Sequence, residues 1–243
     1  MSRRLIFFAV CCLLLCLSAP IHADTVNVVG YGALPGTAAD LTAVNVTQII
    51  GSIPDTTDPL LGVEMFKIDV TNYVDFSAIT NAEALGIPDT ELLLFDSTGL
   101  GVYANDDIDG GNTLSCLPSA DGGNPCPATR PAGVGPTSDG IYYLAITRSS
   151  NLPLSFDGEI FTILNSTDVV GPDLTMGGGS PITGWDGGAF TSPDFDLTGF
   201  DITLTGVSAE VPEPGVLALL LVGMCFLIWR TRQAAASDVS SHS

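Results

Sequence analysis

The sequence has few basic residues, and this shortage limits the partners the protein can have. Residues 24–210 contain 25 Asp or Glu against only three basic residues, Lys67, Arg130 and Arg148, which gives a net charge of −22. Such a charge repels phosphate backbones and anionic membrane surfaces. We therefore expect no nucleic-acid partner, and instead a preference for divalent cations, cationic partners or solution outside the cell.

Histidine is missing from the body of the chain, because His22 and His242 both lie close to the ends. This absence excludes Ser-His-Asp and Cys-His hydrolases and also His-ligated zinc. A pair of carboxylates can hydrolyse glycosides, but nothing distinguishes one pair among the 25 acids of the body. We therefore expect that the protein is not an enzyme.

Cysteine is also scarce once the two apolar ends are set aside. Three of the six cysteines lie in the N-terminal apolar run and one in the C-terminal apolar run, which leaves only Cys116 and Cys126. In an exported protein, two cysteines ten positions apart predict a disulfide. The alternative, a pair of metal-binding thiolates, has no further Cys or His to complete its site.

The N-terminus has the layout of a secretory signal peptide. Arg3 and Arg4 precede an apolar run over residues 5–17, and small residues follow as far as Ala23. We expect residues 1–23 to be removed, so that Asp24 becomes the first residue. The alternative is an uncleaved anchor, for which the apolar run is short.

The C-terminus carries a second targeting pattern in residues 211–232. Pro212, Glu213 and Pro214 precede an apolar run over residues 215–229, which ends at Arg230 and Arg232. This order resembles a PEP-CTERM sorting signal. The resemblance implies an exosortase-type processing enzyme as partner and transient attachment to the membrane.

The length of the apolar run fits that interpretation. As a helix, fifteen residues span only about 22 Å, which is short for a permanent crossing. The polar tail, residues 233–243, departs from the family pattern by following the arginines. An ordinary C-terminal membrane anchor is the alternative.

Alternating apolar and polar residues predict β-strands throughout residues 24–210. The segments "MFKIDV", "DGIYYLAIT" and "FDITLTGV" place Phe66, Tyr142 and Phe200 on inward faces, and "EIFTIL" shows the same period of two. Turn residues separate these segments. We therefore expect an all-β protein with an antiparallel β-sandwich, flanked by the signal peptide and a C-terminal apolar helix.

The segments "EMFKIDV", "TELLLFDSTGLGVYANDD" and "DGIYYLAIT", within residues 64–147, resemble the bacterial pre-peptidase C-terminal (PPC-like) domain. The resemblance implies a jelly-roll-like sandwich that serves as an accessory or binding module. The insertion that contains Cys116 and Cys126 departs from the family pattern, so the resemblance implies no role for that loop.

The segment "NDDIDGGN" is the candidate metal site. It places Asp106, Asp107 and Asp109 within four residues, followed by two glycines that allow the chain to fold back. Clusters with only oxygen ligands suit Ca²⁺, although this spacing is not that of an EF-hand. An ordinary solvated turn is the alternative, since Asp, Asn and Gly dominate turns.

Taken together, these patterns predict a non-catalytic exported protein of the cell surface or extracellular matrix. A carbohydrate- or matrix-binding accessory module, stabilised by calcium, is the alternative. Its expected partner is an extracellular polysaccharide or matrix component.

Overall fold

The computed structural model describes residues 24–53, 62–81, 89–122, 126–187 and 199–207. Within these residues every regular element is a β-strand, so the predicted all-β class is confirmed. No helix in this part of the chain is long and apolar enough to cross a membrane. The predicted signal peptide and the predicted C-terminal helix lie outside the described residues.

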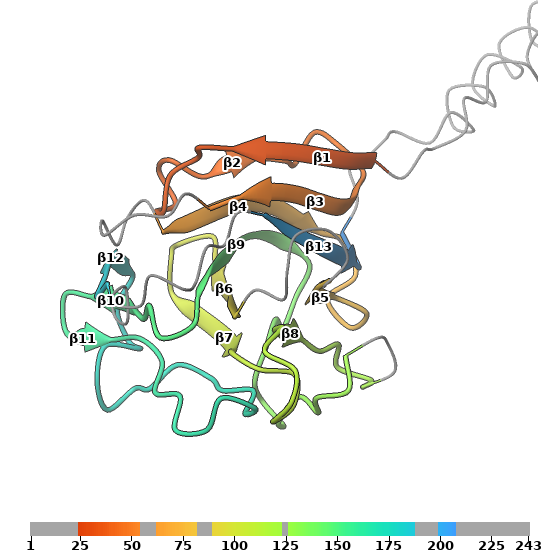
Figure 1. Cartoon of the computed structure of the whole chain (residues 1–243). Coiled ribbons are helices and arrows are strands. Elements are labelled where there is room, and N and C mark those ends of the chain that lie inside the picture. The colour runs from red at the N-terminus through yellow and green to blue at the C-terminus, as the bar shows by residue number, and fades with distance from the viewer. Residues whose placement is uncertain (1–23, 54–61, 82–88, 123–125, 188–198, 208–243) are drawn as a thin grey trace, which may run out of the picture. The chain divides into compact units, whose positions relative to one another are not determined.

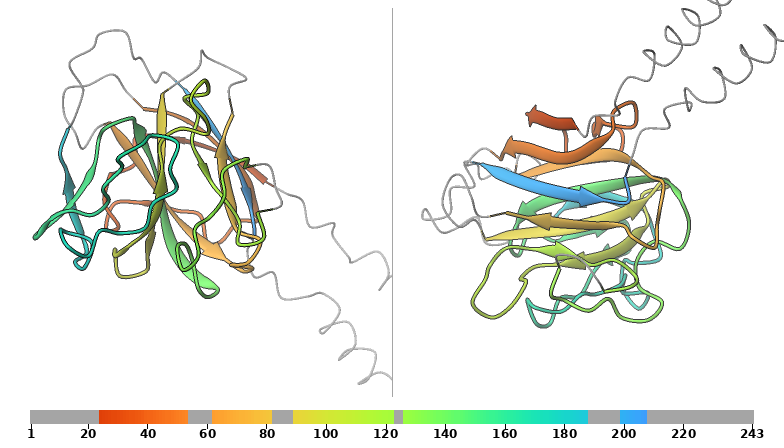
Figure 2. Two further views of the ribbon diagram at one scale, coloured as in Figure 1. Left: turned by 90° about the horizontal axis from the view of Figure 1, so that it is seen from below. Right: turned by 90° about the vertical axis from the view of Figure 1, so that its right-hand side faces the viewer.

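The strands form two five-stranded sheets and one small sheet (Figures 1 and 2). The first sheet has the order β1 (Asp24–Val29), β3 (Val46–Ser52), β13 (Phe200–Thr205), β5 (Ser77–Thr80) and β8 (Cys116–Leu117). The second has the order β2 (Ala39–Asp40), β4 (Val63–Val70), β9 (Gly140–Arg148), β6 (Thr90–Asp96) and β7 (Gly101–Asn105). The third consists of β11 (Gly158–Glu159), β10 (Pro153–Ser155) and β12 (Ile182–Trp185).

The main core combines side chains from both five-stranded sheets, as expected for a sandwich. Alternate residues of β4 and β9 enter it, including Phe66, Ile68, Leu144 and Ile146. From the first sheet come Ile49, Ala78, Ile202 and Leu204 among others. The inward faces predicted from the period of two are therefore confirmed for these strands.

The opposite face of the second sheet is buried as well, which the alternation does not predict. Leu93 and Phe95 of β6 lie in a second core, where Phe161 and Trp185 cover them. The Trp185 ring lies edge-on to Phe95 at 6.4 Å, and its Nε1 donates a hydrogen bond to Ala33 O at 2.9 Å. Because both faces of β6 are buried, its central residues 92–95 form a continuous apolar run.

The segment "EIFTIL" is not the strand that its pattern predicts. Only Glu159 belongs to a strand, β11, and the chain then leaves the sheet. Ile160 and Phe161 instead pack into the second core. The apolar residues of this segment therefore mark buried positions, although the segment is not a paired strand.

The prediction of purely antiparallel sheets is wrong at two places, because β1 pairs parallel to β3 and β2 pairs parallel to β4. The cause is the path of the chain. Strands β1 to β4 alternate between the first and the second sheet. Successive strands of one sheet are therefore joined through the other sheet, and such a crossover permits parallel pairing.

Candidate metal centre

Several acidic residues meet at one end of the second sheet. Strand β6 pairs antiparallel with both β7 and β9, so the start of β6 lies beside the ends of its two neighbours. Asp89 immediately precedes β6, Asp106 and Asp107 follow β7, and Ser149 follows β9. The amide of Ser149 donates a hydrogen bond to Asp89 O at 3.2 Å, which joins two of these ends.

The period of two in the strands places Glu91 on the face of the second core. In β6 this residue is two positions before Leu93, which pairs with Ala104 of β7, and Asp106 follows two positions after Ala104, directly beyond the end of β7. Leu93 and Ala104 both belong to the second core. Glu91 and Asp106 therefore project from the same face of the sheet.

Three carboxylates of this group lie close enough to share one ion. Oxygens of Asp89, Asp106 and Asp107 all lie within 4.8 Å of one another. Ser149 Oγ donates a hydrogen bond to Asp106 Oδ2 at 3.0 Å. Asp106 is buried, whereas Asp89 and Asp107 are partly exposed, so the group is open to solvent on one side.

Glu91 and Asp106 have buried oxygens without a hydrogen-bond partner of good geometry. Glu91 has no exposed surface, and neither of its carboxylate oxygens receives such a bond. Asp106 Oδ1 is in the same situation. The neighbouring Thr147 hydroxyl is engaged elsewhere, because it donates to Gly62 O and accepts from Asn151. Buried carboxylates without partners are costly unless a charge balances them.

The pKa values of three carboxyls in this group are raised, which also indicates unbalanced negative charge. Burial, with Asp106, Asp186 and Asp89 as neighbouring charges, raises the pKa of Glu91 well above its ordinary value, and the nearby amide of Ser150 lowers it only in part. Burial likewise raises the pKa of Asp106 to about 7. Burial and the Asp107 carboxylate raise that of Asp89. Every charged neighbour that shifts these pKa values is another carboxylate.

The backbone is strained beside this group. Ser150 adopts a φ of 67°, in the left-handed region that non-glycine residues rarely enter. It occupies the turn between β9 and β10, next to Ser149. This turn brings the Ser150 amide towards Glu91.

The structure groups the sequence-predicted ligands differently from the segment "NDDIDGGN". Asp106 and Asp107 are brought together with Asp89, whereas Asp109 lies exposed in its own turn. Asp109 Oδ1 accepts a hydrogen bond from Gly111 N at 2.9 Å, and Asp109 O accepts one from Asn112 N at 3.0 Å. Asp109 therefore closes the turn.

Sequence reasoning missed Asp89 and Glu91. Both lie in "DTELLLF", where Glu91 directly precedes an apolar run over residues 92–95. A charged residue on the same strand face as Leu93 and Phe95 is an available signal, since unpaired acids are rarely placed on buried faces. Recognising it requires knowing that both faces of β6 are covered.

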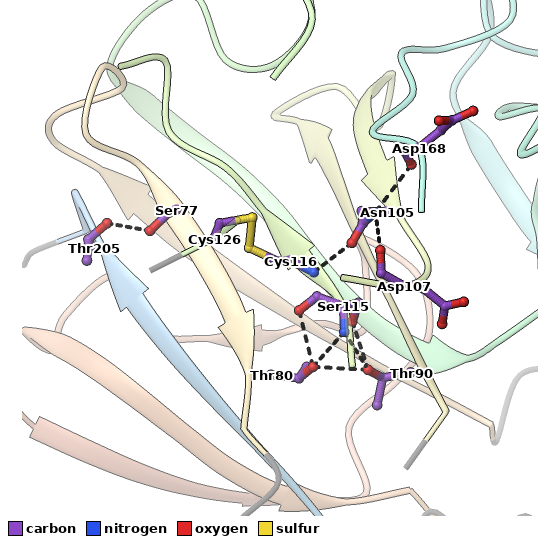
Figure 3. The surroundings of a disulfide bond; sticks show 10 residues. All are labelled: Ser77, Thr80, Thr90, Asn105, Asp107, Ser115, Cys116, Cys126, Asp168 and Thr205. Carbon is purple, nitrogen blue, oxygen red and sulfur yellow. Dashed lines mark hydrogen bonds between the residues drawn. A yellow bond between two sulfur atoms is a disulfide. The ribbon is translucent and has the colours of Figure 1, made fainter. Parts of the chain in front are cut away.

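The predicted disulfide between Cys116 and Cys126 is confirmed, with 5.7 Å between the two Cα atoms (Figure 3). Cys116 lies in β8 and both cysteines are buried, so the bond braces the long loop between β7 and β9 from inside. Beside it the Thr90 hydroxyl lies 2.8 Å from Ser115 Oγ and 3.0 Å from Thr80 Oγ1.

A separate open pocket of about 380 Å³ lies over the first sheet and the segment after Asp107. Amide, carboxylate and aliphatic side chains line it: Gln48, Ile79, Thr80, Asn81, Ile108, Asn112, Leu114 and Asp201. The amides are partly held in place, since Gln48 Nε2 and Asn81 Nδ2 donate to opposite oxygens of Asp201.

Comparison of the chain with protein-family models, curated proteins and solved structures finds no match. The sorting motif Pro212, Glu213 and Pro214 lies outside the described residues. The resemblances to the PEP-CTERM signal and to the PPC-like domain therefore stay predictions.

Proposed function

We propose that the chain is an exported, non-catalytic protein of the cell surface or extracellular matrix, delivered there by an exosortase-type system. The observation that carries the proposal is the Cys116–Cys126 disulfide. Disulfides of this kind persist in oxidising compartments and are rare in the cytosol. The signal-peptide pattern of residues 1–23 and the targeting pattern of residues 211–232 support the same compartment.

The absence of histidine from the body supports a non-catalytic role, because it removes the commonest general base. Of the carboxylates at the end of the second sheet, Glu91 and Asp106 are buried. Asp106 and Asp107 are neighbours on one loop, and their close spacing is typical of cation binding. Glycosidase carboxylates, in contrast, lie on opposite sides of a sugar-sized cleft.

The test is mass spectrometry of the mature protein from its native host. The N-terminal peptide is expected to start at Asp24, and no peptide should contain residues 217–229. Replacing the Pro212, Glu213 and Pro214 triplet by alanines should leave the tail intact and keep the protein in the membrane fraction. Glu210→Ala, just outside the motif, is the matched control and should be processed normally. An intact tail in mature wild-type material would support an ordinary membrane anchor instead.

The open pocket favours a second candidate, a module that binds extracellular carbohydrate or matrix. Its amide and carboxylate groups match the hydroxyl groups of a sugar, and its aliphatic side chains offer an apolar wall. A glycan array checks this function directly. Binding that is lost in Asn81→Ala and retained in Asn165→Ala would establish it, because Asn81 lines the pocket and Asn165 does not.

A further inference from the structure

We propose that Asp89, Asp106 and Asp107 bind one calcium ion, and that this ion balances the buried charge of Glu91 behind them. The site differs from the continuous acidic segment that the sequence suggests, because it joins two parts of the chain and leaves Asp109 out. The inference stands independently of the export route.

The first argument is geometric. Calcium binds oxygen at about 2.3–2.6 Å, so two ligands on opposite sides of one ion lie about 4.6–5.2 Å apart. The three carboxylates offer oxygens within 4.8 Å of one another. Three oxygens at these separations therefore surround a space of about the size that one calcium ion occupies.

The second argument is the set of buried oxygens without partners. Glu91 is fully buried and neither of its oxygens has a hydrogen-bond partner of good geometry, and the same holds for Asp106 Oδ1. Leu92, next to Glu91, pairs with Asn105, next to Asp106, and both carboxylates follow the face of Leu93 and Ala104, so they lie at the same edge of the sheet. A fold does not retain two such acids side by side unless protons or a cation neutralise them.

The donor set selects calcium among the metals. Every candidate ligand is a hard oxygen, and the cysteines of the body are used in the disulfide. Asp89 and Asp107 are partly exposed, which leaves room for water molecules to complete six to eight ligands. Magnesium demands stricter octahedral geometry and gives up its water reluctantly.

The proposed calcium site adjoins the open pocket. The Asp107 amide donates to Ser166 O at 2.7 Å, so the ligand loop is already joined to the segment after β11. The next residues along the chain include Ile108, Asn112 and Leu114, which line the open pocket. An ion on Asp106 and Asp107 would therefore fix one wall of that pocket.

The experiment is thermal unfolding and isothermal calorimetry of the full-length chain, in calcium and in chelator at equal ionic strength. Extracellular calcium sites have dissociation constants on the order of 10⁻⁴–10⁻³ M. At ten times the dissociation constant the melting temperature is expected to rise by about 3–6 °C. Sodium at matched ionic strength controls for general screening of the acidic surface, and magnesium should give a smaller rise.

The variants make the ligand set testable. Asp89→Asn and Asp107→Asn should each remove the calcium-dependent rise, and both positions are partly exposed, so the fold should survive. Asp109→Asn is the matched control and should keep the rise. A wild-type melting temperature that is equal in calcium and chelator overturns the proposal. So does a rise that is lost in Asp109→Asn but kept in Asp107→Asn.

Glu91→Gln tests the buried charge separately. This substitution keeps the shape of the side chain and removes its charge, so it should raise the melting temperature in chelator and reduce the further rise that calcium gives. An unchanged calcium response in Glu91→Gln would show that the ion does not balance Glu91, and would overturn that part of the proposal.

Discussion

The side chain of Asn105 accepts a hydrogen bond from the backbone amide of Cys116 at 2.8 Å (Figure 3). Its Nδ2 group also donates to Asp107 O at 3.0 Å and to Asp168 O at 3.3 Å. This fully buried amide therefore joins the disulfide loop, the acidic loop and the segment after β11. The disulfide and the candidate metal centre are connected through one residue.

Replacing Asn105 by alanine should destabilise the protein strongly. The substitution removes three hydrogen bonds and leaves the buried Cys116 amide unpaired, at a cost of about 2–4 kcal/mol. Denaturant unfolding measures the loss. The control is Asn165→Ala, which removes one hydrogen bond to Asp168 Oδ2 at a more exposed site and should cost less than about 1 kcal/mol. Equal losses in the two variants would contradict the central position of Asn105.

Reducing the Cys116–Cys126 disulfide should lower the free energy of unfolding by roughly 2–3 kcal/mol. The physical reason is that the bond closes a loop of ten residues and so restricts the unfolded chain. Denaturant unfolding with and without reductant measures the change, and non-reducing peptide mapping should find one linked peptide pair. Free thiols at both positions, or identical unfolding midpoints, would contradict the prediction.

Much of the fold is predictable because the alternation of apolar and polar residues shows which side of each strand faces the core. Phe66 and Ile68 alternate with Lys67, and Phe200, Ile202 and Leu204 enter the core as their spacing predicts. The disulfide is predictable for a different reason, since it is the one pairing open to the two cysteines of the body. The strand faces depend on residues that are neighbours in sequence, and the disulfide depends on there being only one possible pair of cysteines in the body.

The rest depends on contacts between distant segments, which local patterns do not record. The parallel pairing of β1 with β3 follows from the path of the chain between sheets. Glu91 is buried on the face of β6 where Phe95 packs against Trp185 of the third sheet. Likewise, the sequence pairs Asp107 with Asp109, although the fold pairs it with Asp89 from another strand.

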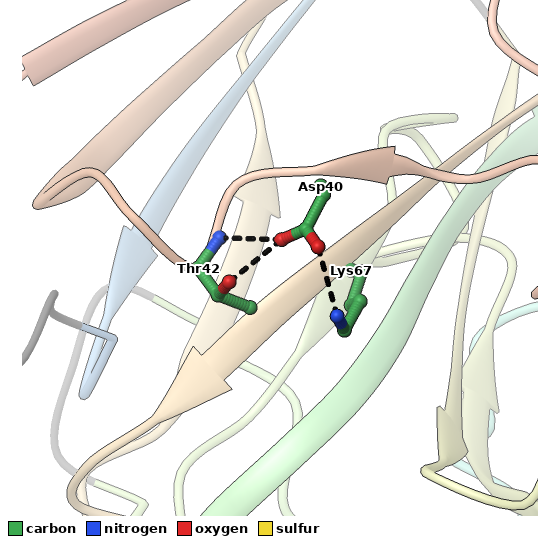
Figure 4. Close-up of polar contacts among 3 residues, drawn as sticks. All are labelled: Asp40, Thr42 and Lys67. Carbon is green, nitrogen blue, oxygen red and sulfur yellow. Dashed lines mark hydrogen bonds and ion pairs between the residues drawn. The ribbon is translucent and has the colours of Figure 1, made fainter.

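The Asp40 carboxyl should titrate well below an ordinary aspartate (Figure 4). Hydrogen bonds from Lys67 Nζ at 2.8 Å and from the Thr42 side chain at 2.6 Å and the Thr42 amide lower the pKa of Asp40 to about 2. The ionised form is thus favoured in the folded state. Its contribution to stability is present above the unfolded value of 3.8 and is lost as the pH falls through about 2.

Carbon-detected NMR of the side-chain carboxyl measures this titration. In Lys67→Met the pKa of Asp40 should move up toward the ordinary value, because the largest cause of the shift is removed. Asp173 is an internal control in the same spectra: its pKa is also lowered, but by Thr175 and Thr162, so it should not respond to Lys67→Met. The effect on overall stability should be small, because the ion pair is exposed. A midpoint near 4 in the wild type would contradict the prediction.

Glycines 30 and 206 provide a matched pair that separates backbone strain from packing. Both adopt left-handed conformations, with φ of 76° and 68°. A Cβ at Gly30 would meet nothing within 4 Å, whereas one at Gly206 would lie 2.5 Å from Asn72 O and 2.8 Å from the backbone of Phe76. The carbonyl of Gly206 also accepts hydrogen bonds from the amides of Thr71 and Asn72. These bonds hold Gly206 against the turn after β4, so the backbone cannot move away from an added Cβ without breaking them.

Gly30→Ala should therefore cost about 1–2 kcal/mol, which is the penalty of a left-handed alanine. Gly206→Ala carries the same penalty and must also displace backbone, so it should cost roughly 3 kcal/mol or more. Denaturant unfolding of the two variants side by side gives the difference directly, and the shared φ cancels in it. If the two variants lose equal stability, the close approach of β13 to the turn after β4 does not hold in solution.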